Sequence, residues 1–100
     1  MKEIKAIIQP FMLTDVLHAL EEIESLPGVT VSHLSGWGKS KAREAKVATN
    51  EGGHRMAGKT KLEIVVADDM VDTVISAIAK AAHTGQFGDG KIFVSEIAEI

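Results

Sequence analysis

The stretch Leu62-Glu-Ile-Val-Val66 decides the fold, because it has a counterpart in the first half of the chain. A shift of 58 residues lays Ile4-Lys-Ala-Ile-Ile8 over it, and the same shift aligns the apolar residues that follow each stretch. Short runs of this kind are typical of β-strands, and apolar residues at helical spacing indicate an amphipathic helix. The sequence therefore contains two copies of one strand–helix unit.

Each predicted helix is followed by a further strand. Pro10 separates the first strand from its helix, and Asp68 or Asp69 is the predicted N-cap of the second helix. The apolar faces of the two helices consist of Leu13, Val16, Leu17, Leu20 and Ile23, and of Val71, Val74, Ile75, Ile78 and Ala82. Strands are predicted again at residues 29–34 and 92–97. The element order is therefore βαβ–βαβ.

This order predicts an α+β, ferredoxin-like fold, in which two helices lie on one face of a four-stranded antiparallel sheet. A chain of 100 residues corresponds to a single domain over residues 1–100. The stretches 4–8 and 62–66 both have apolar residues pointing to either side, although the helices cover only one face. We therefore expect the uncovered face to pack against other copies of the chain.

The composition excludes several classes of protein. The formal net charge is −3, so no strong field draws the chain to nucleic acid or to acidic membranes. The absence of cysteine excludes disulfides and thiolate metal sites, and it agrees with a reducing cytoplasm. The sequence has neither the ~18 consecutive apolar residues of a membrane-spanning helix nor a signal peptide. We expect a cytoplasmic domain that does not insert into membranes.

The segment Thr84-Gly-Gln-Phe-Gly-Asp-Gly-Lys91 combines three glycines with a lysine. This composition suits a loop whose backbone N–H groups surround a phosphate. The spacing of Gly85 and Gly90-Lys91 resembles a Walker A motif, but residue 92 is isoleucine where that motif has Ser or Thr. A Walker loop also leads from a strand into a helix, whereas this segment leads from a helix into a strand. The sequence therefore predicts a phosphate-binding loop that is not a P-loop.

A long polar segment, residues 39–58, separates the two halves and shows no sustained periodicity. Loops of about 20 residues are uncommon inside a compact domain and are often functional. The alternative is a tolerated surface insertion. The regular strands on both sides favour a functional loop.

These motifs together resemble those of the P-II signal-transduction proteins. The stretch Thr84–Val94 is similar to their C-terminal signature, Gly36-Trp-Gly-Lys39 to the entry of their long T-loop, and Met1–Phe11 to their first strand. The resemblance implies a non-enzymatic homotrimer that binds ATP or ADP in clefts between subunits. It also implies a T-loop, here 39–58, that controls a transporter or an enzyme, in nitrogen regulation.

The resemblance further implies which residues bind the nucleotide. The predicted B-loop, residues 84–91, supplies the phosphate-binding residues Gly88, Asp89, Gly90 and Lys91. Gly36, Gly38 and Lys39 match the opposite side of the cleft, where lysine replaces the family's arginine and loses its bidentate geometry. Ile7, Thr30, Glu63 and Val65 match positions around the adenine and ribose. From the sequence alone, Ile7 and Val65 are equally compatible with the core.

Effector binding is expected to differ from that of the family. Lys59 matches a lysine that binds 2-oxoglutarate, but Ser40 replaces a glutamine that ligates magnesium and Ala42 replaces a glycine. We therefore expect that 2-oxoglutarate is not sensed in the usual way. The family's modified T-loop tyrosine falls at Gly52, and the sequence contains no tyrosine. The printed sequence stops at Ile100, so we also expect no basic C-terminal extension over the phosphates and a correspondingly weaker affinity.

Two other functions remain open at this stage. One is a P-II relative that serves another transport system, for bicarbonate, a metal or another ion, with a different effector or none. A metal-tolerance trimer of the CutA type has the same fold. The four histidines, His18, His33, His54 and His83, lack the spacing of a metal-binding motif, so we predict no metal site.

Overall fold

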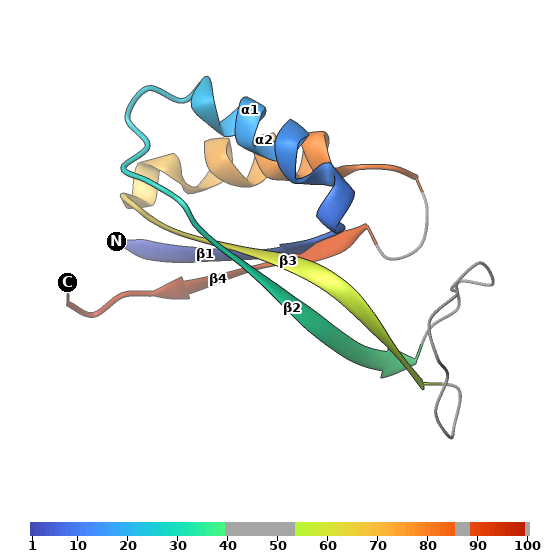
Figure 1. The fold of residues 1–100 in the computed structure, drawn as a ribbon. Helices are drawn as coiled ribbons and strands as arrows, with labels where there is room; N and C mark the ends of the chain where they lie inside the picture. The colour runs from blue at the N-terminus through green and yellow to red at the C-terminus, as the bar shows by residue number, and fades with distance from the viewer. Residues whose placement is uncertain (40–53, 86–88, 100) are drawn as a thin grey trace.

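The computed structural model describes residues 1–39, 54–85 and 89–99. Over these residues the elements are β1 (Lys2–Ile8), η1 (Pro10–Met12), α1 (Leu13–Glu21), β2 (Thr30–Lys39), β3 (His54–Val66), η3 (Asp68–Met70), α2 (Val71–Ala82) and β4 (Gly90–Glu96). The described strands form one antiparallel sheet in the order β2-β3-β1-β4. Both helices lie on the same face of this sheet (Figure 1). The predicted ferredoxin-like fold is confirmed.

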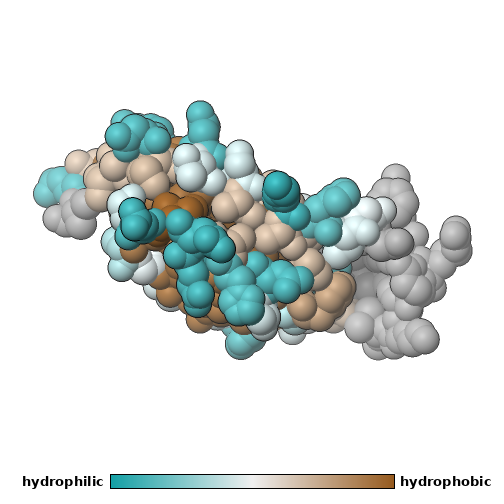
Figure 2. Space-filling view, turned by 90° about the horizontal axis from the view of Figure 1, so that it is seen from above, coloured by the Kyte–Doolittle hydropathy of each residue, from teal (hydrophilic) through white to brown (hydrophobic). Residues whose placement is uncertain are grey.

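The core lies between the sheet and the helices, and it is built from alternate residues of the two central strands. Ile4, Ala6 and Ile8 of β1 are at most 2% exposed, and Leu62, Ile64 and Val66 of β3 are equally buried. The helices contribute Val16, Leu20, Val74 and Ile78 from the faces that the sequence predicted. Seen from the helical side, the surface mixes hydrophilic and hydrophobic side chains, as amphipathic helices require (Figure 2). Neither helix of the described residues is long and apolar enough to span a membrane.

The strands β2 and β3 are longer than the sequence pattern indicated. They pair continuously from Thr30 opposite Glu63 to Lys39 opposite His54. Residues 39 and 54–58, which we had expected to be loop, therefore belong to the sheet. The prediction was wrong there because backbone pairing does not require alternating apolar side chains, and this ribbon extends past the helical layer (Figure 1). Residues 40–53, the remainder of the predicted T-loop, lie outside the described residues.

The predicted N-cap of the second helix was also wrong. A 3₁₀ turn, η3, precedes α2, so Met70 occupies the N-cap position and makes no side-chain capping bond. The Asp68 carboxylate instead lies 3.0 Å from the amino group of Met1 and 3.8 Å from Lys2 Nζ. The bond from the Met1 amino group and the charge of Lys2 hold the pKa of Asp68 below its usual value. This aspartate connects the start of α2 to the start of β1.

Candidate functional site

The strand registers place the predicted binding residues Ile7, Thr30, Glu63, Val65 and Lys91 on the face of the sheet opposite the helices. Paired residues on neighbouring antiparallel strands point to the same face. One such row consists of Ser32, Lys61, Ile7 and Lys91, from β2, β3, β1 and β4 in turn. The next row consists of Thr30, Glu63, Lys5 and Phe93. No element of the described residues covers this face (Figure 1), which is called the open face below.

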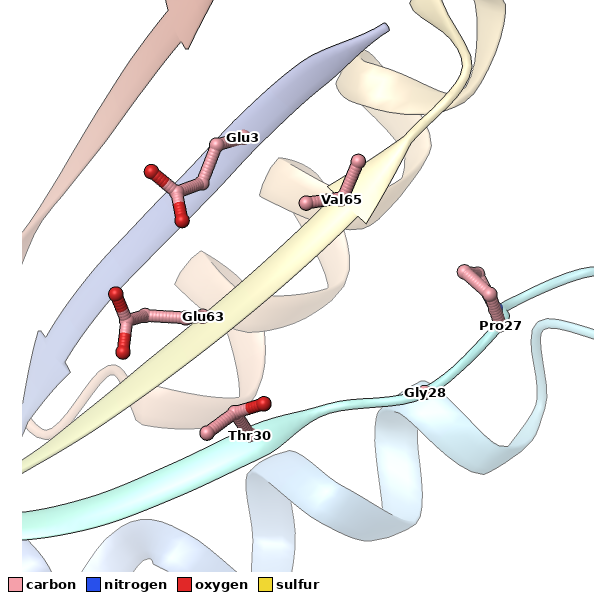
Figure 3. A pocket seen from close by; sticks show the side chains of 6 residues that line it. All are labelled: Glu3, Pro27, Gly28, Thr30, Glu63 and Val65. Atoms are coloured by element: carbon pink, nitrogen blue, oxygen red, sulfur yellow. The ribbon is translucent and has the colours of Figure 1, made fainter. Parts of the chain in front are cut away.

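Three of the predicted residues line one shallow pocket at the β2 edge of the sheet. This pocket has a volume of about 400 Å³, and it is lined by Glu3, Pro27, Gly28, Thr30, Glu63 and Val65. Figure 3 shows Glu63 and Val65 on β3, Glu3 on the neighbouring β1 and Thr30 at the start of β2. The predicted contacts Thr30, Glu63 and Val65 are therefore brought together by adjacent strands.

The sequence had left open whether Ile7 and Val65 are core residues. Both lie on the open face and are half-buried, whereas their neighbours Ile8, Ile64 and Val66 are buried beneath the helices. The single chain thus leaves both apolar side chains partly accessible on the face that carries the pocket. This position allows them to contact a flat apolar ligand, and their role in binding stays a prediction.

Sequence reasoning missed Glu3, Pro27 and Gly28 as pocket residues. Glu3 pairs with Val65, so strand register identifies it once the pairing of β1 with β3 is known. Pro27 and Gly28 belong to the segment that leads into β2, where no motif indicated a binding role (Figure 3). The two carboxylates of Glu3 and Glu63 make this pocket acidic and able to accept hydrogen bonds.

The glycine-rich segment ends at the start of β4. Its predicted residues Asp89, Gly90 and Lys91 lie in three different environments. The Asp89 carboxylate accepts hydrogen bonds from the backbone N–H groups of Thr84 (2.8 Å) and Gly85 (3.1 Å) and from the Thr84 hydroxyl. Lys91 is exposed, and among the described residues no carboxylate forms an ion pair with it. Lys91 can therefore offer its charge to an anion, whereas Asp89 is engaged within the chain.

Gly90 is required by the packing of β4 on β1. Its φ is +137°, a backbone conformation that residues with a side chain rarely adopt. A Cβ atom at this position would lie 2.2 Å from the carbonyl oxygen of Ile7. Only glycine lets the two strands approach so closely at this point. This close approach also sets the position of Lys91, the next residue of β4, which pairs with Ile7. Gly88 lies outside the described residues.

The remaining predicted residues lie along the extended β2–β3 ribbon. Gly36 pairs with Ala57, Gly38 with Arg55 and Lys39 with His54. A Cβ atom on Gly36 would lie 3.4 Å from the Cγ atom of Lys59, so these two predicted residues are neighbours. Lys59 is half-buried on the open face, and Ser40 lies outside the described residues. Within one chain, the ribbon end and the start of β4 are separate parts of the predicted site.

The comparison with known proteins gives a direct result. The family described as "Nitrogen regulatory protein P-II" matches residues 1–100. This chain belongs to the P-II family. It is 46% identical over 99 residues to the "Nitrogen regulatory protein P-II" of Bradyrhizobium diazoefficiens, covering 99% of this chain and 88% of that protein. It is 44% identical over 100 residues to "Nitrogen regulatory protein P-II" of Klebsiella oxytoca and to "Nitrogen regulatory protein P-II 1" of Escherichia coli K12, each covering all of this chain and 88% of the relative.

Membership in the P-II family confirms the sequence-based interpretation and sets aside the CutA-type alternative. The chain is a signal-transduction regulator in nitrogen regulation, and P-II proteins act as trimers that regulate partner proteins. The P-II family binds adenine nucleotides. The acidic pocket, the open face and the exposed Lys91 are therefore the parts of this chain to consider for a nucleotide.

The described residues offer no obvious metal centre. Within them, no group of three or more His, Asp or Glu side chains is arranged to hold a metal ion. Nδ1 of His33 lies 3.1 Å from the hydroxyl oxygen of the buried Thr60, and Nδ1 of His83 lies 3.5 Å from the Asp89 carboxylate. Both rings therefore have partners within the chain.

Proposed function

We propose that this chain binds ATP or ADP in clefts between the subunits of a homotrimer, and that the nucleotide controls a transporter or an enzyme through residues 39–58. The observation that supports this proposal best is the pocket that combines Thr30, Glu63 and Val65, three residues that the family resemblance assigns to nucleotide binding. Their convergence from two strands is what a shared ligand would require. Binding is regulatory in this proposal, and no reaction is assigned.

The charges on the open face orient the nucleotide. The carboxylates of Glu3 and Glu63 repel phosphates, but they accept hydrogen bonds from the amino group of adenine or the hydroxyl groups of ribose. Lys91 lies one row further along the sheet, in the row of Ile7. The nucleoside therefore occupies the acidic pocket against Val65, and the phosphates extend toward Lys91, whose charge offsets theirs. Lys61 lies in the same row as Lys91, with its Nζ 3.8 Å from Glu63.

A second copy of the chain completes the site in this proposal. The pocket lies on a face that no described element covers, so one chain supplies only one wall for a nucleotide (Figure 1). Ligand sites bury most of their ligand, which a shallow pocket on a single sheet does not do. The exposed Phe93 and the half-buried Ile7 on the same face favour packing of further copies. The Gly36–Lys39 end of the ribbon then forms the opposite wall for a neighbouring subunit.

The control step is a shift between two arrangements of the T-loop that connects β2 to β3. A ligand that binds one arrangement more tightly increases its population and so exposes or withdraws the segment from a partner. We propose cytoplasmic action on such a partner. Because Ser40 cannot reproduce the amide oxygen of glutamine, we also propose that 2-oxoglutarate does not strengthen ATP binding here. The second function, control of another transport system, is favoured by this same departure in Ser40 and Ala42.

Calorimetry with ATP, ADP and AMP, each with and without magnesium and 2-oxoglutarate, tests the proposal. We expect the unmodified chain to bind ATP or ADP, and Lys91→Ala to weaken binding by about 10- to 100-fold, as expected for a charge-assisted contact. Glu63→Gln should weaken binding by about tenfold without lowering the free energy of unfolding. Ile64→Val, on the opposite face of the same strand, is the control: it should lower stability by about 1 kcal/mol and leave affinity unchanged.

Three results would count against parts of this scheme. No binding at millimolar nucleotide would overturn the nucleotide proposal and leave the fold intact. If Glu63→Gln and Ile64→Val changed nucleotide affinity equally, the pocket would not be part of the nucleotide-binding site. Stronger ATP binding in the presence of 2-oxoglutarate would show that Ser40 does not prevent the usual effector response.

A further inference from the structure

Asp89 belongs to the predicted phosphate-binding loop, but the contacts of its side chain were not predicted from the sequence. Its Oδ2 atom accepts hydrogen bonds from two successive backbone N–H groups, those of Thr84 at 2.8 Å and Gly85 at 3.1 Å. Its Oδ1 atom accepts the Thr84 hydroxyl. Both oxygens of the carboxylate are thus bonded to residues four and five positions earlier in the chain. These three bonds are called the Asp89–Thr84 bridge below.

The bridge joins the two ends of the glycine-rich segment. Thr84 and Gly85 follow α2, and Asp89 directly precedes β4. The φ of Gly85 is +85°, in the left-handed region that glycine adopts readily. This backbone conformation favours glycine at position 85, independently of any ligand.

The bridge also determines how Asp89 affects an anion. The side chain of Asp89 is only 26% exposed, and His83 Nδ1 lies 3.5 Å from Oδ2. The hydrogen bonds from Thr84, first from its hydroxyl and then from its N–H, hold the pKa of Asp89 below its usual value. The carboxylate is thus ionised at neutral pH, and its negative charge is stabilised by the donors of Thr84 and Gly85. Gly90 and Lys91, which follow directly, pair with Ile8 and Ile7 of β1.

We propose that Asp89 is a positioning residue: through its bridge to Thr84 and Gly85 it ties the segment after α2 to the start of β4 and so helps to place Lys91, and it does not itself touch the nucleotide or its magnesium ion. This inference rests on the proposed nucleotide site. It assigns to Thr84 a role that the site prediction lacked, and it removes Asp89 from the set of ligand contacts.

Asparagine at position 89 distinguishes positioning from ligand contact. In Asp89→Asn the amide oxygen can accept the two N–H groups, and the amide nitrogen can donate to the Thr84 hydroxyl, so the bridge is retained without its charge. Asp89→Ala removes the bridge. Thr84→Val removes the hydroxyl bond to Asp89 at nearly constant volume, and Thr84→Ser retains it.

The test measures ATP affinity by calorimetry, with and without magnesium, and amide hydrogen exchange at Thr84 and Gly85. We expect affinity to fall about tenfold in Asp89→Ala and about threefold in Thr84→Val. Asp89→Asn and Thr84→Ser should bind as tightly as the unmodified chain, or more tightly in Asp89→Asn because a negative charge is removed. Exchange at both amides should accelerate in Asp89→Ala but not in Asp89→Asn.

The opposite pattern would overturn the inference. If Asp89 contacts the nucleotide or its magnesium ion, Asp89→Asn weakens magnesium–ATP binding as much as Asp89→Ala does, and Thr84→Val has no effect. If Asp89→Ala fails to fold, Thr84→Val and Thr84→Ser still decide between the two outcomes. Fast exchange at Thr84 and Gly85 in the unmodified chain would disprove the bridge. Failure of the unmodified chain to bind nucleotide would instead disprove the proposed function, with the exchange result unaffected.

Discussion

Ile64 and Val65 are adjacent on β3, yet they belong to two different environments. Ile64 is 1% exposed beneath the helices, whereas Val65 lies half-buried in a pocket on the open face. The same alternation separates Ile8 from Ile7 on β1. Both faces carry apolar residues, but only one is covered by the chain's own helices. Apolar residues on β1 and β3 therefore stabilise the fold on one face, and on the other face they remain accessible for the association and nucleotide binding that we propose.

The largest expected effect comes from truncating the buried member of this pair. Ile64→Ala should lower the free energy of unfolding by about 2–5 kcal/mol, because it removes packed methyl groups and leaves a cavity. Val65→Ala should cost about 1 kcal/mol or less and should mainly weaken nucleotide binding. Urea unfolding at fixed protein concentration measures both, since stability in an oligomer depends on concentration. Equal losses of stability would show that the two faces are equally packed.

A smaller loss of stability is expected at the junction of β4 with β1. Gly90→Ala places a Cβ atom 2.2 Å from the Ile7 carbonyl oxygen at a φ of +137°, so it should destabilise by about 1–3 kcal/mol. Gly58→Ala is the matched control, because nothing lies within 4 Å of its Cβ atom and its φ is not positive. That substitution should be neutral or slightly stabilising, since alanine loses less backbone entropy in a strand. A neutral Gly90→Ala, by the same urea measurement, would mean that β4 can move away from β1.

The smallest effect is expected at the ion pair that connects the start of α2 to the start of β1. Asp68 pairs with the Met1 amino group and Lys2, which lowers its pKa from 3.8. A lowered carboxylate pKa stabilises the fold above the unfolded-state pKa, and this contribution is lost as pH falls through the folded-state value. Asp68→Asn should therefore slightly lower Tm at pH 7, and the difference should shrink as pH falls below about 4. A Tm difference that is constant between pH 7 and pH 3 would exclude this ion pair as the cause.

Much of the fold was predictable because its signals are local. The repeated strand–helix unit and the helical faces indicated two βαβ halves, and the strands and helices agree apart from their ends. The ends differed where side-chain pattern and backbone pairing are independent, as in residues 54–58. The N-cap at Asp68 was wrong because a 3₁₀ turn precedes α2, and the aspartate pairs with a group that is distant in sequence.

The candidate site was predictable only in part. The resemblance selected Thr30, Glu63 and Val65, which do line one pocket, but it did not select Glu3, which reaches the pocket through its register with Val65. It also selected Asp89 with the phosphate-binding glycines, although the carboxylate is bonded to Thr84 and Gly85. Residue type and spacing indicate which groups are near a ligand. They do not indicate where a side chain points.

The sequence by itself determined the family, the order of the elements and the residues able to form two apolar faces, because periodicity and motif spacing are properties of the chain alone. Only the tertiary structure decided which apolar face the helices cover, that Gly90 must be glycine, and that Asp89 binds backbone rather than facing outward. These features depend on contacts between β1, β4 and the end of α2, which are far apart in sequence. Strand register and the close approach of backbone segments determine these features, and neither produces a local pattern in the sequence.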